Sequence, residues 1–216
     1  MDSATCLYVA RQRGFSVYAL SFRYGQKHLH EIRSATALAQ SLPVVEHKIL
    51  TLDSDFITGS ALTGHGVIAK NGGSAKDIPN TYVPARNTIF LAIALGWAEA
   101  LNIHDIFIGV NAVDYSGYPD CRPEFIESFE KLANLATKDG VSGRPFRLHA
   151  PLLHLSKAEI IHLGLTLQVD YRLTHSCYDP QADGLACGLC DSCRLRRAGF
   201  QSAGIQDPIS YSSDVC

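Results

Sequence analysis

A group of cysteines near the C-terminus has the spacing of a metal site. Its members are separated by nine, two and two residues and are Cys177, Cys187, Cys190 and Cys193. Two-residue spacers let successive sulfurs curl around one ion at about 2.3 Å, and four thiolates complete a tetrahedral shell. Because no position is left for a reactive water, the pattern predicts a structural metal, and we expect the chemistry to lie elsewhere in the chain.

Zinc is the metal that this pattern favours. A closely spaced cysteine triplet also occurs in iron–sulfur ligation, but here the fourth cysteine comes first and no Cys-Pro pair follows. Gly188 helps the backbone to curl between ligands. The alternative, four ordinary small apolar residues, fits poorly with the polar neighbours Asp191 and Ser192.

Length and composition indicate a globular protein with a sizeable core. The chain has 216 residues, 46% of them hydrophobic, which is enough for one domain and a small appendage. Nineteen basic residues stand against twenty-one acidic ones, so no broad cationic field is available for a nucleic-acid backbone. We therefore expect a small-molecule substrate and no nucleic-acid partner.

The sequence favours a cytoplasmic protein with no membrane partner. The longest uncharged apolar stretch in the middle of the chain, residues 87–98, is about half of what a bilayer-spanning helix needs. Asp2 stands where a signal peptide would be basic, and no long apolar core with a cleavage site follows. Seven cysteines would stay reduced in the cytoplasm, where clustering favours metal ligation over disulfides.

Strand-like and helix-like patterns alternate along the chain. Short β-rich runs occur at 17–22, 44–49 and 103–110. Helical patterns occupy 3–13, 27–40, 88–101, 123–137 and 157–163. The alternation predicts an α/β fold with a doubly wound, mostly parallel sheet covered on both faces. Asn87 is the predicted N-cap of the third helix.

Two segments depart from this alternation. Residues 51–80 form a long connection with five glycines, which predicts a lid or mobile flap. From 175 onward the chain becomes rich in cysteine and glycine, before a basic turn at 194–197. We therefore divide the chain into a main domain over 1–174 and a small zinc-binding subdomain with a tail over 175–216.

Several short motifs together point to a family. The chain opens Met-Asp-Ser and passes directly into a helical pattern. Further motifs are Phe-Arg-Tyr-Gly-Gln-Lys-His at 22–28, Val-Pro-Ala-Arg-Asn at 83–87, the segment 109–122, Leu-Ser-Lys at 155–157 and the cysteine group. In this order, and over nearly the whole chain, they resemble the 7-cyano-7-deazaguanine synthase family of the N-type ATP pyrophosphatases, with an adenine nucleotide alpha hydrolase-like fold.

The resemblance has one departure. The opening looks like the end of the family's Ser-Gly-Gly-x-Asp-Ser pyrophosphate loop, whose glycines let backbone N–H groups wrap the ATP phosphates at a helix N-terminus. This chain keeps only Asp2 and Ser3 of that loop. The preceding strand and Ser-Gly-Gly are absent, so either the sequence begins downstream of its natural start or the cradle is half as long.

The resemblance implies a reaction and its cofactors. It implies conversion of 7-carboxy-7-deazaguanine and ammonia to 7-cyano-7-deazaguanine, with ATP and Mg²⁺, in queuosine biosynthesis. If ammonia attacked the carboxylate directly, oxide would have to leave. Adenylation makes that oxygen part of AMP, which is a far better leaving group. Ammonia then gives an amide, and a second activation gives the nitrile. A homodimer and a structural Zn²⁺ are also implied.

Phosphate-binding roles follow from the resemblance for four residues. Ser3 would donate to phosphate, and Asp2 would organise the loop or the magnesium; a simple N-cap is the alternative. Arg86 and Lys157 would neutralise polyphosphate or the charge developing at phosphorus. For Lys157 the alternative is a solvated surface charge.

Substrate-binding roles follow for a second set. Asp114 or Asp120 could accept the two adjacent donors of a deazaguanine edge, although an Asp in such a loop is often a turn former. Tyr24 and Tyr118 would stack on the heterocycle. Arg122, Arg23 or Lys27 could meet its carboxylate, and Gln26 is a further candidate for substrate binding from the same motifs. The role of His28 stays open: His28 and His30 are two apart on a predicted helix and share no face, which argues against a second metal site.

Two rival functions remain. One is a related pyrophosphate-loop ligase or sulfurtransferase that adenylates tRNA, against which the near-neutral charge and the saturated metal site weigh. The other is a non-catalytic zinc module that binds a partner through Arg194, Arg196 and Arg197. ATP binding would separate the second rival from an enzyme.

Overall fold

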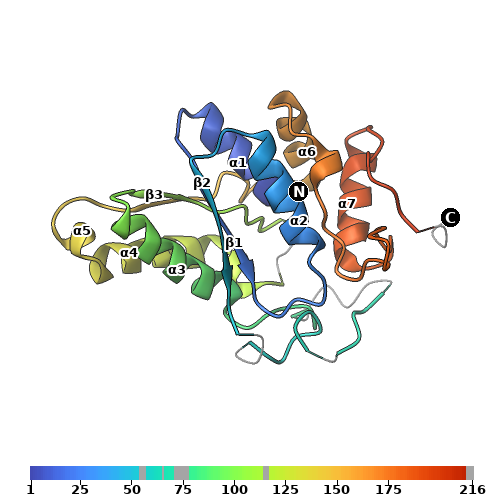
Figure 1. The fold of residues 1–216 in the computed structure, drawn as a ribbon, viewed down its shortest axis with the longest axis horizontal. Coiled ribbons are helices and arrows are strands. Elements are labelled where there is room, and N and C mark those ends of the chain that lie inside the picture. Colours follow the sequence, from blue (N-terminus) through green and yellow to red (C-terminus); the bar gives the residue numbers. More distant parts are fainter. Residues whose placement is uncertain (54–56, 65, 71–77, 114–116, 213–216) are drawn as a thin grey trace.

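The computed structural model describes residues 1–53, 57–64, 66–70, 78–113 and 117–212 (Figure 1). Helices and short strands alternate along the first three quarters of the chain, and the cysteine-bearing segment follows. None of the helices in these ranges has the length and apolar character needed to cross a bilayer.

The element order agrees closely with the expected alternation. The strands are β1 (Tyr18–Arg23), β2 (Glu46–Thr51), β3 (Asp105–Phe107) and β4 (Arg147–His149). The helices are α1 (Asp2–Gln12), α2 (His30–Ser41), α3 (Arg86–Ala100), α4 (Pro123–Ala136), α5 (Lys138–Val141), α6 (Lys157–Thr166) and α7 (Asp191–Ser202). Two short 3₁₀ helices, η1 and η2, cover Pro119–Cys121 and Tyr171–Leu173.

All strand pairs among the described residues are parallel. β1 pairs with β2 in a register that runs from Tyr18 opposite Glu46 to Arg23 opposite Thr51. β3 pairs with β4 in the same sense. The expected α/β class with parallel strands is confirmed, and within the described residues the strands form two separate pairs.

Helices cover the strands from two sides, with α1, α2 and α6 above them and α3, α4 and α5 below in the view of Figure 1. Leu95 of α3 and Phe129 of α4 belong to one buried cluster, against which Ile106 of β3 packs. A second cluster joins α1, α2, α6 and α7, with Ile161 and Phe200 at its centre. Each layer thus has its own apolar core, as a sheet covered on both faces requires.

Helix α3 begins earlier than its sequence pattern predicted. Asn87 is not the N-cap: Ala85 holds that position, and Asn87 lies inside the first turn. The Asp120 carboxylate accepts a hydrogen bond of 3.0 Å from the Asn87 N–H, and the Asn87 side chain donates to the Asp120 carbonyl over 2.9 Å. A residue far away in the sequence therefore does the work of a local cap.

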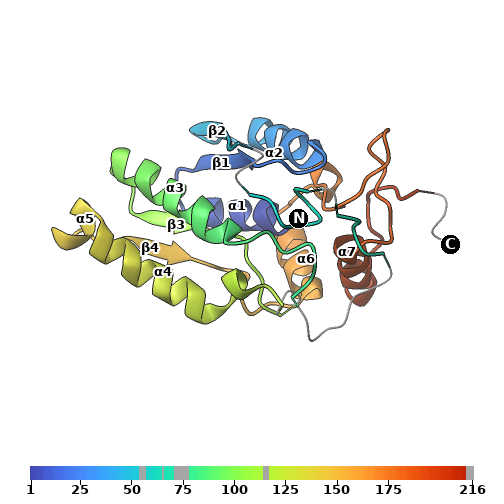
Figure 2. The same ribbon diagram turned by 90° about the horizontal axis from the view of Figure 1, so that it is seen from below.

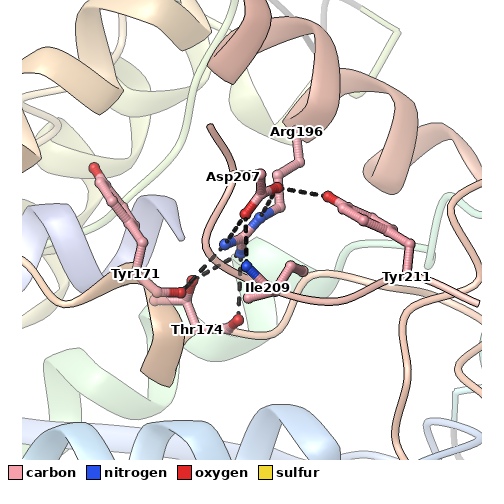
Figure 3. Close-up of polar contacts among 6 residues, drawn as sticks. All are labelled: Tyr171, Thr174, Arg196, Asp207, Ile209 and Tyr211. Atoms are coloured by element: carbon pink, nitrogen blue, oxygen red, sulfur yellow. Dashed lines mark hydrogen bonds and ion pairs between the residues drawn. The ribbon is translucent and has the colours of Figure 1, made fainter. Parts of the chain in front are cut away.

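The C-terminal part is organised around α7, which packs on α6 (Figure 2). Arg196 of α7 is 1% exposed and donates two hydrogen bonds, of 2.8 and 2.9 Å, to the two oxygens of Asp207. It also donates to Thr174 and to the Tyr171 carbonyl, while the Tyr211 hydroxyl donates to Asp207 (Figure 3). This network ties three segments together, so the basic turn is partly internal. The division at 174/175 stays a prediction.

The described parts of the long 51–80 connection pack against the cysteine segment. Ile57, Leu62 and Ile68 are buried in the same apolar cluster as the four cysteines. The backbone of Lys70 forms an isolated antiparallel β-bridge with that of Cys190. These residues act as a covering layer for the cysteines; the rest of the expected lid includes residues outside the described ranges.

Candidate active site and metal centre

The cysteine sulfurs converge on one point. The Sγ atoms of Cys177, Cys187, Cys190 and Cys193 all lie within 4.8 Å of one another, and every one of these residues is at most 2% exposed. A tetrahedral ion with metal–sulfur bonds of about 2.3 Å needs sulfurs about 3.8 Å apart. The predicted metal site is thus a cluster in space as well as in sequence, and its donor set fits a thiolate-bound ion.

Backbone N–H groups turn toward these sulfurs. Four of them donate to Sγ atoms over 3.2–3.4 Å, and they belong to Tyr178, Asp179, Cys187 and Cys190. Hydrogen bonds from its cysteine neighbours lower the pKa of Cys190, whereas the contact with Cys190 raises the pKa of Cys177. The packed sulfurs cannot all be charged together, and a bound dication would remove that conflict.

The N-terminus of α1 carries the next group of predicted residues. The Asp2 carboxylate accepts two hydrogen bonds, of 2.9 and 3.1 Å, from the Lys157 ammonium. Ser3 is exposed in the first turn, and no side chain caps this helix. A methyl group on Gly109 would lie 2.8 Å from the Ser3 nitrogen, so Gly109 is required for this close approach.

Lys157 is built into its position by three neighbouring elements. It is 5% exposed and is the first residue of α6, which is held by a capping box between Ser156 and Glu159. A methyl group on Gly199 of α7 would lie 2.3 Å from the Lys157 Cγ. The missing side chain at Gly199 therefore makes room for the lysine stem, and Lys157 is not a solvated surface charge.

A pocket beside the cysteine cluster gathers part of the predicted substrate set. Its lining residues are Tyr24, Gln26, Lys27, His28, Glu31, Leu62, Arg86 and Tyr178. Tyr24 belongs to the buried cluster around the cysteines, and Tyr178 follows the first metal-site cysteine. The pocket and the metal site therefore share a wall.

Arg86 is the cation on the pocket wall that lies against Tyr24. Burial works against its charged form, but the Tyr24 and Tyr178 hydroxyls more than compensate and raise the pKa of Arg86. Burial raises the pKa of Tyr24 despite the nearby guanidinium. Arg86 thus presents a permanent positive charge beside the neutral phenol of Tyr24.

Gln26 is fixed by its own turn. Its Oε1 accepts a hydrogen bond of 2.7 Å from the Tyr24 N–H, and its Nε2 donates to the Phe22 carbonyl over 3.0 Å. Gly25 between them has a φ of +84°, a value that favours glycine. Gln26 therefore shapes the segment that carries Tyr24 as well as lining the pocket.

Among the described residues, Tyr118, Asp120 and Arg122 do not line this pocket. The Tyr118 hydroxyl lies 2.8 Å from Thr81 Oγ1, and the Asp120 carboxylate is engaged at the start of α3. Arg122 is exposed at the start of α4. Asp114 lies outside the described residues. The substrate roles of these four residues stay predictions.

Three histidines meet at the pocket, where His28 is part of the lining. The ring centroids of His28, His30 and His175 lie 5.2 to 5.8 Å apart. The premise that both His28 and His30 lie on a helix was wrong, because α2 begins at His30 and leaves His28 in the preceding loop. Among the described residues, the cysteine cluster alone brings three or more metal-binding side chains within ligating reach.

Comparison with known proteins identifies the family. The family model described as queuosine biosynthesis protein QueC matches residues 1–204. The chain belongs to this family.

Curated members of the QueC family are similar to this chain over nearly their whole length. A 7-cyano-7-deazaguanine synthase from Syntrophotalea carbinolica is 60% identical over 100% of this chain and 94% of its own. One from Methylococcus capsulatus is 61% identical over 99% and 95%, respectively. Among solved structures, the U34-tRNA thiolase NcsA from Methanococcus maripaludis with its [4Fe-4S] cluster aligns at 16% identity and a TM-score of 0.47, covering 100% of this chain and 72% of that one.

Membership of the QueC family makes the chain an enzyme of queuosine biosynthesis, of the ligase type. The resemblance inferred from the sequence motifs is thereby confirmed. Pocket residues that the motifs did not single out are Glu31, Leu62 and Tyr178. Tyr178 had a usable signal, since it adjoins Cys177, whereas Glu31 resembles an ordinary first-turn acid of a helix.

Proposed function

We propose that this enzyme converts 7-carboxy-7-deazaguanine and ammonia to 7-cyano-7-deazaguanine at the expense of two ATP molecules. The observation that carries the proposal is 60% identity, over the whole chain, to a protein named 7-cyano-7-deazaguanine synthase. The pocket supports it, because aromatic, cationic and anionic side chains meet there, and its Glu31 acts electrostatically on the Met1 amino group next to α1. A flat, anionic heterocycle suits such a lining.

The chemistry needs two adenylations. The substrate carboxylate attacks the α-phosphorus of ATP and releases pyrophosphate, which gives an acyl adenylate. Ammonia replaces AMP, loses a proton and leaves an amide. The amide oxygen attacks the α-phosphorus of a second ATP and releases a second pyrophosphate. Loss of AMP and of both amide protons then gives the nitrile. The protein contributes mainly position and charge neutralisation.

Phosphate binding is proposed at the start of α1. The uncapped first turn offers N–H groups to an anion, and Ser3 adds a hydroxyl donor. Lys157, held by Asp2, and Arg86 are proposed to neutralise the phosphates and the charge at the reacting phosphorus. Asp2 would help to hold Mg²⁺, which would supply positive charge to the phosphates.

Substrate binding is proposed in the adjoining pocket, with Tyr24 as a stacking surface and Gln26 as a polar contact. Tyr118, Asp120, Arg122 and Asp114 form a second proposed set that would contact substrate from the α3 side. The ring stack of Tyr82 on Tyr118, with centroids 6.0 Å apart, gives that side an aromatic surface as well.

For the cysteine site we propose zinc in a structural role. Four buried sulfurs with four N–H donors leave no room for a water ligand, which suits a closed tetrahedral site. The ion would brace the wall that carries Tyr178. A cytoplasmic homodimer is part of the same proposal.

The test is a product assay. Incubation with 7-carboxy-7-deazaguanine, ATP, Mg²⁺ and ammonium should give the nitrile together with AMP and pyrophosphate in a 1:2:2 ratio, as the two adenylations require. Omission of ammonium should leave the nitrile unformed. Production of ADP, or modification of added tRNA without nitrile formation, would reject the proposal in favour of a different ligase. A protein that binds no ATP would support the non-catalytic rival.

A further inference from the structure

Glu31 is the one carboxylate among the residues that line the described pocket. The other charged or basic side chains there are Lys27, His28 and Arg86. Glu31 lies in the first turn of α2. The pocket thus has one anionic group set against several cationic or basic ones.

The Glu31 carboxylate makes no hydrogen bond or ion pair with another described residue. It is half-buried and acts electrostatically on Arg86, Tyr24 and His28 without contacting them as an ion pair. A partly buried carboxylate is stabilised by donors, and here no neighbouring side chain supplies them. Two acceptor oxygens therefore remain for a ligand.

Lys27, the lysine of the pocket lining, is tied to the 51–80 connection. The Lys27 ammonium donates a hydrogen bond of 2.6 Å to the Gly66 carbonyl, and the Lys27 N–H donates to the Leu62 carbonyl. Arg86 faces the Tyr24 hydroxyl inside the pocket. The pocket therefore offers an acceptor at Glu31 and a cation at Arg86.

The proposed substrate has matching polarity. A guanine edge presents a ring N–H and an exocyclic amine side by side, which one carboxylate can accept together. The other end of the same heterocycle carries the reacting carboxylate, which a guanidinium suits. Asp120 is less suited to the edge, because one of its oxygens is committed to the Asn87 N–H.

We propose that Glu31 binds the donor edge of the deazaguanine and sets the selectivity for a 2-amino heterocycle. This inference rests on the proposed function, whose substrate it orients: the donor edge lies toward α2 and the carboxylate toward Arg86. Glu31 then acts in binding and takes no part in bond making or breaking.

The experiment compares two ligands and three proteins. The ligands are 7-carboxy-7-deazaguanine and its analogue without the 2-amino group. The proteins are wild type, Glu31→Ala, and Glu124→Ala as the control, because Glu124 is an exposed acid in the first turn of α4. Calorimetric titration without ATP gives the Kd of each pair, and thermal melting shows that each variant is folded.

Wild type and the Glu124 variant should bind the 2-amino ligand about 10- to 150-fold more tightly than the analogue, the range for a hydrogen bond to a charged group. Glu31→Ala should bind the 2-amino ligand more weakly by that factor, so that its Kd values for the two ligands become equal. For Glu31→Gln, the ratio of the two Kd values should lie between those of wild type and Glu31→Ala. The glutamine amide oxygen can accept from one donor, while its NH₂ group opposes the other.

A Glu31→Ala variant that keeps the full preference, or that weakens both ligands equally, would overturn the inference. A wild type that binds neither ligand would overturn it as well. The outcomes stay separate from those of the proposed function: a wild type that binds with the expected preference but forms no AMP would reject the reaction and keep the Glu31 role.

Discussion

The cysteine cluster and the neighbouring pocket share a wall, but they differ in how far the described residues satisfy their polar groups. Around the cluster, four N–H groups point at sulfur and a buried Arg196–Asp207 pair holds the helix behind it. In the pocket, the Glu31 carboxylate and Nδ1 of His28 have no partner among the described residues. The first region is complete without a substrate, whereas the second has polar groups to offer one.

This difference separates the two roles within one enzyme. Tyr178 marks the boundary, because its N–H donates to Cys190 Sγ over 3.4 Å while the residue lines the pocket. A metal held by the cysteines would fix that wall without entering the chemistry. Substitutions in the cysteine cluster should therefore lower stability first, and substitutions in the pocket should weaken substrate binding first.

The largest effect is expected from Cys190→Ser. Loss of one thiolate should release the metal and destabilise the fold by more than about 4 kcal/mol, since metal binding is coupled to folding. Metal content by mass spectrometry and thermal melting measure this. The control is Cys6→Ala, a buried cysteine outside the cluster, which should keep its metal. A Cys190→Ser protein with full metal content and an unchanged Tm would contradict the structural role.

The next effect is expected from Arg196→Met. This change leaves the Asp207 carboxylate buried without its guanidinium, which typically costs about 3–5 kcal/mol. Arg194→Met on the exposed face of the same helix should change the free energy of unfolding by less than about 0.5 kcal/mol. Urea denaturation measures both. Equal effects of the two substitutions would show that the network in Figure 3 contributes little.

A smaller effect is expected at Gly199, where α7 packs on the stem of Lys157. In Gly199→Ala the new methyl group would overlap the Lys157 stem, and such overpacking costs about 1–3 kcal/mol. The KM for ATP should rise as Lys157 shifts. Gly96→Ala is the matched control, because this exposed helical glycine has open space around it, and it should stabilise by about 0.5–1 kcal/mol. If both variants gain stability, the proposed packing is wrong.

The smallest effect is expected from Asp120→Asn. Weakening the hydrogen bond to the Asn87 N–H at the start of α3 should cost about 1 kcal/mol. The KM for the heterocycle should stay unchanged if Asp120 serves only that helix. A KM that rises much more than stability falls would instead support the substrate role that the motif predicted for Asp120.

Features set by neighbouring residues were predictable from the sequence. The metal site depends on two-residue spacers between cysteines, and the four sulfurs met as expected. Helix α4 was predicted to within one residue, because its apolar residues recur with helical spacing. The family motifs added the functional class, which no periodicity could supply.

Features set by distant residues were not predictable. Asp120 holds the start of α3 from 33 residues away, and β4 has three residues, too few to show a period of two. The start of α2 was placed too early, because the Lys27 N–H is drawn instead to the Leu62 carbonyl. That error hid the meeting of His28 with His30, and Glu31 became a pocket residue only once the fold was known.

The central claim is that the enzyme activates the substrate carboxylate by adenylation, with the substrate in the pocket and the phosphates at the start of α1. An isotope tests this claim most directly. Substrate labelled with ¹⁸O in both carboxylate oxygens should be incubated with ATP, Mg²⁺ and ammonium, and the AMP analysed by mass spectrometry. Two adenylations predict that one labelled oxygen enters each of the two AMP molecules formed per nitrile. Label found in water or in pyrophosphate, with unlabelled AMP, would contradict the account.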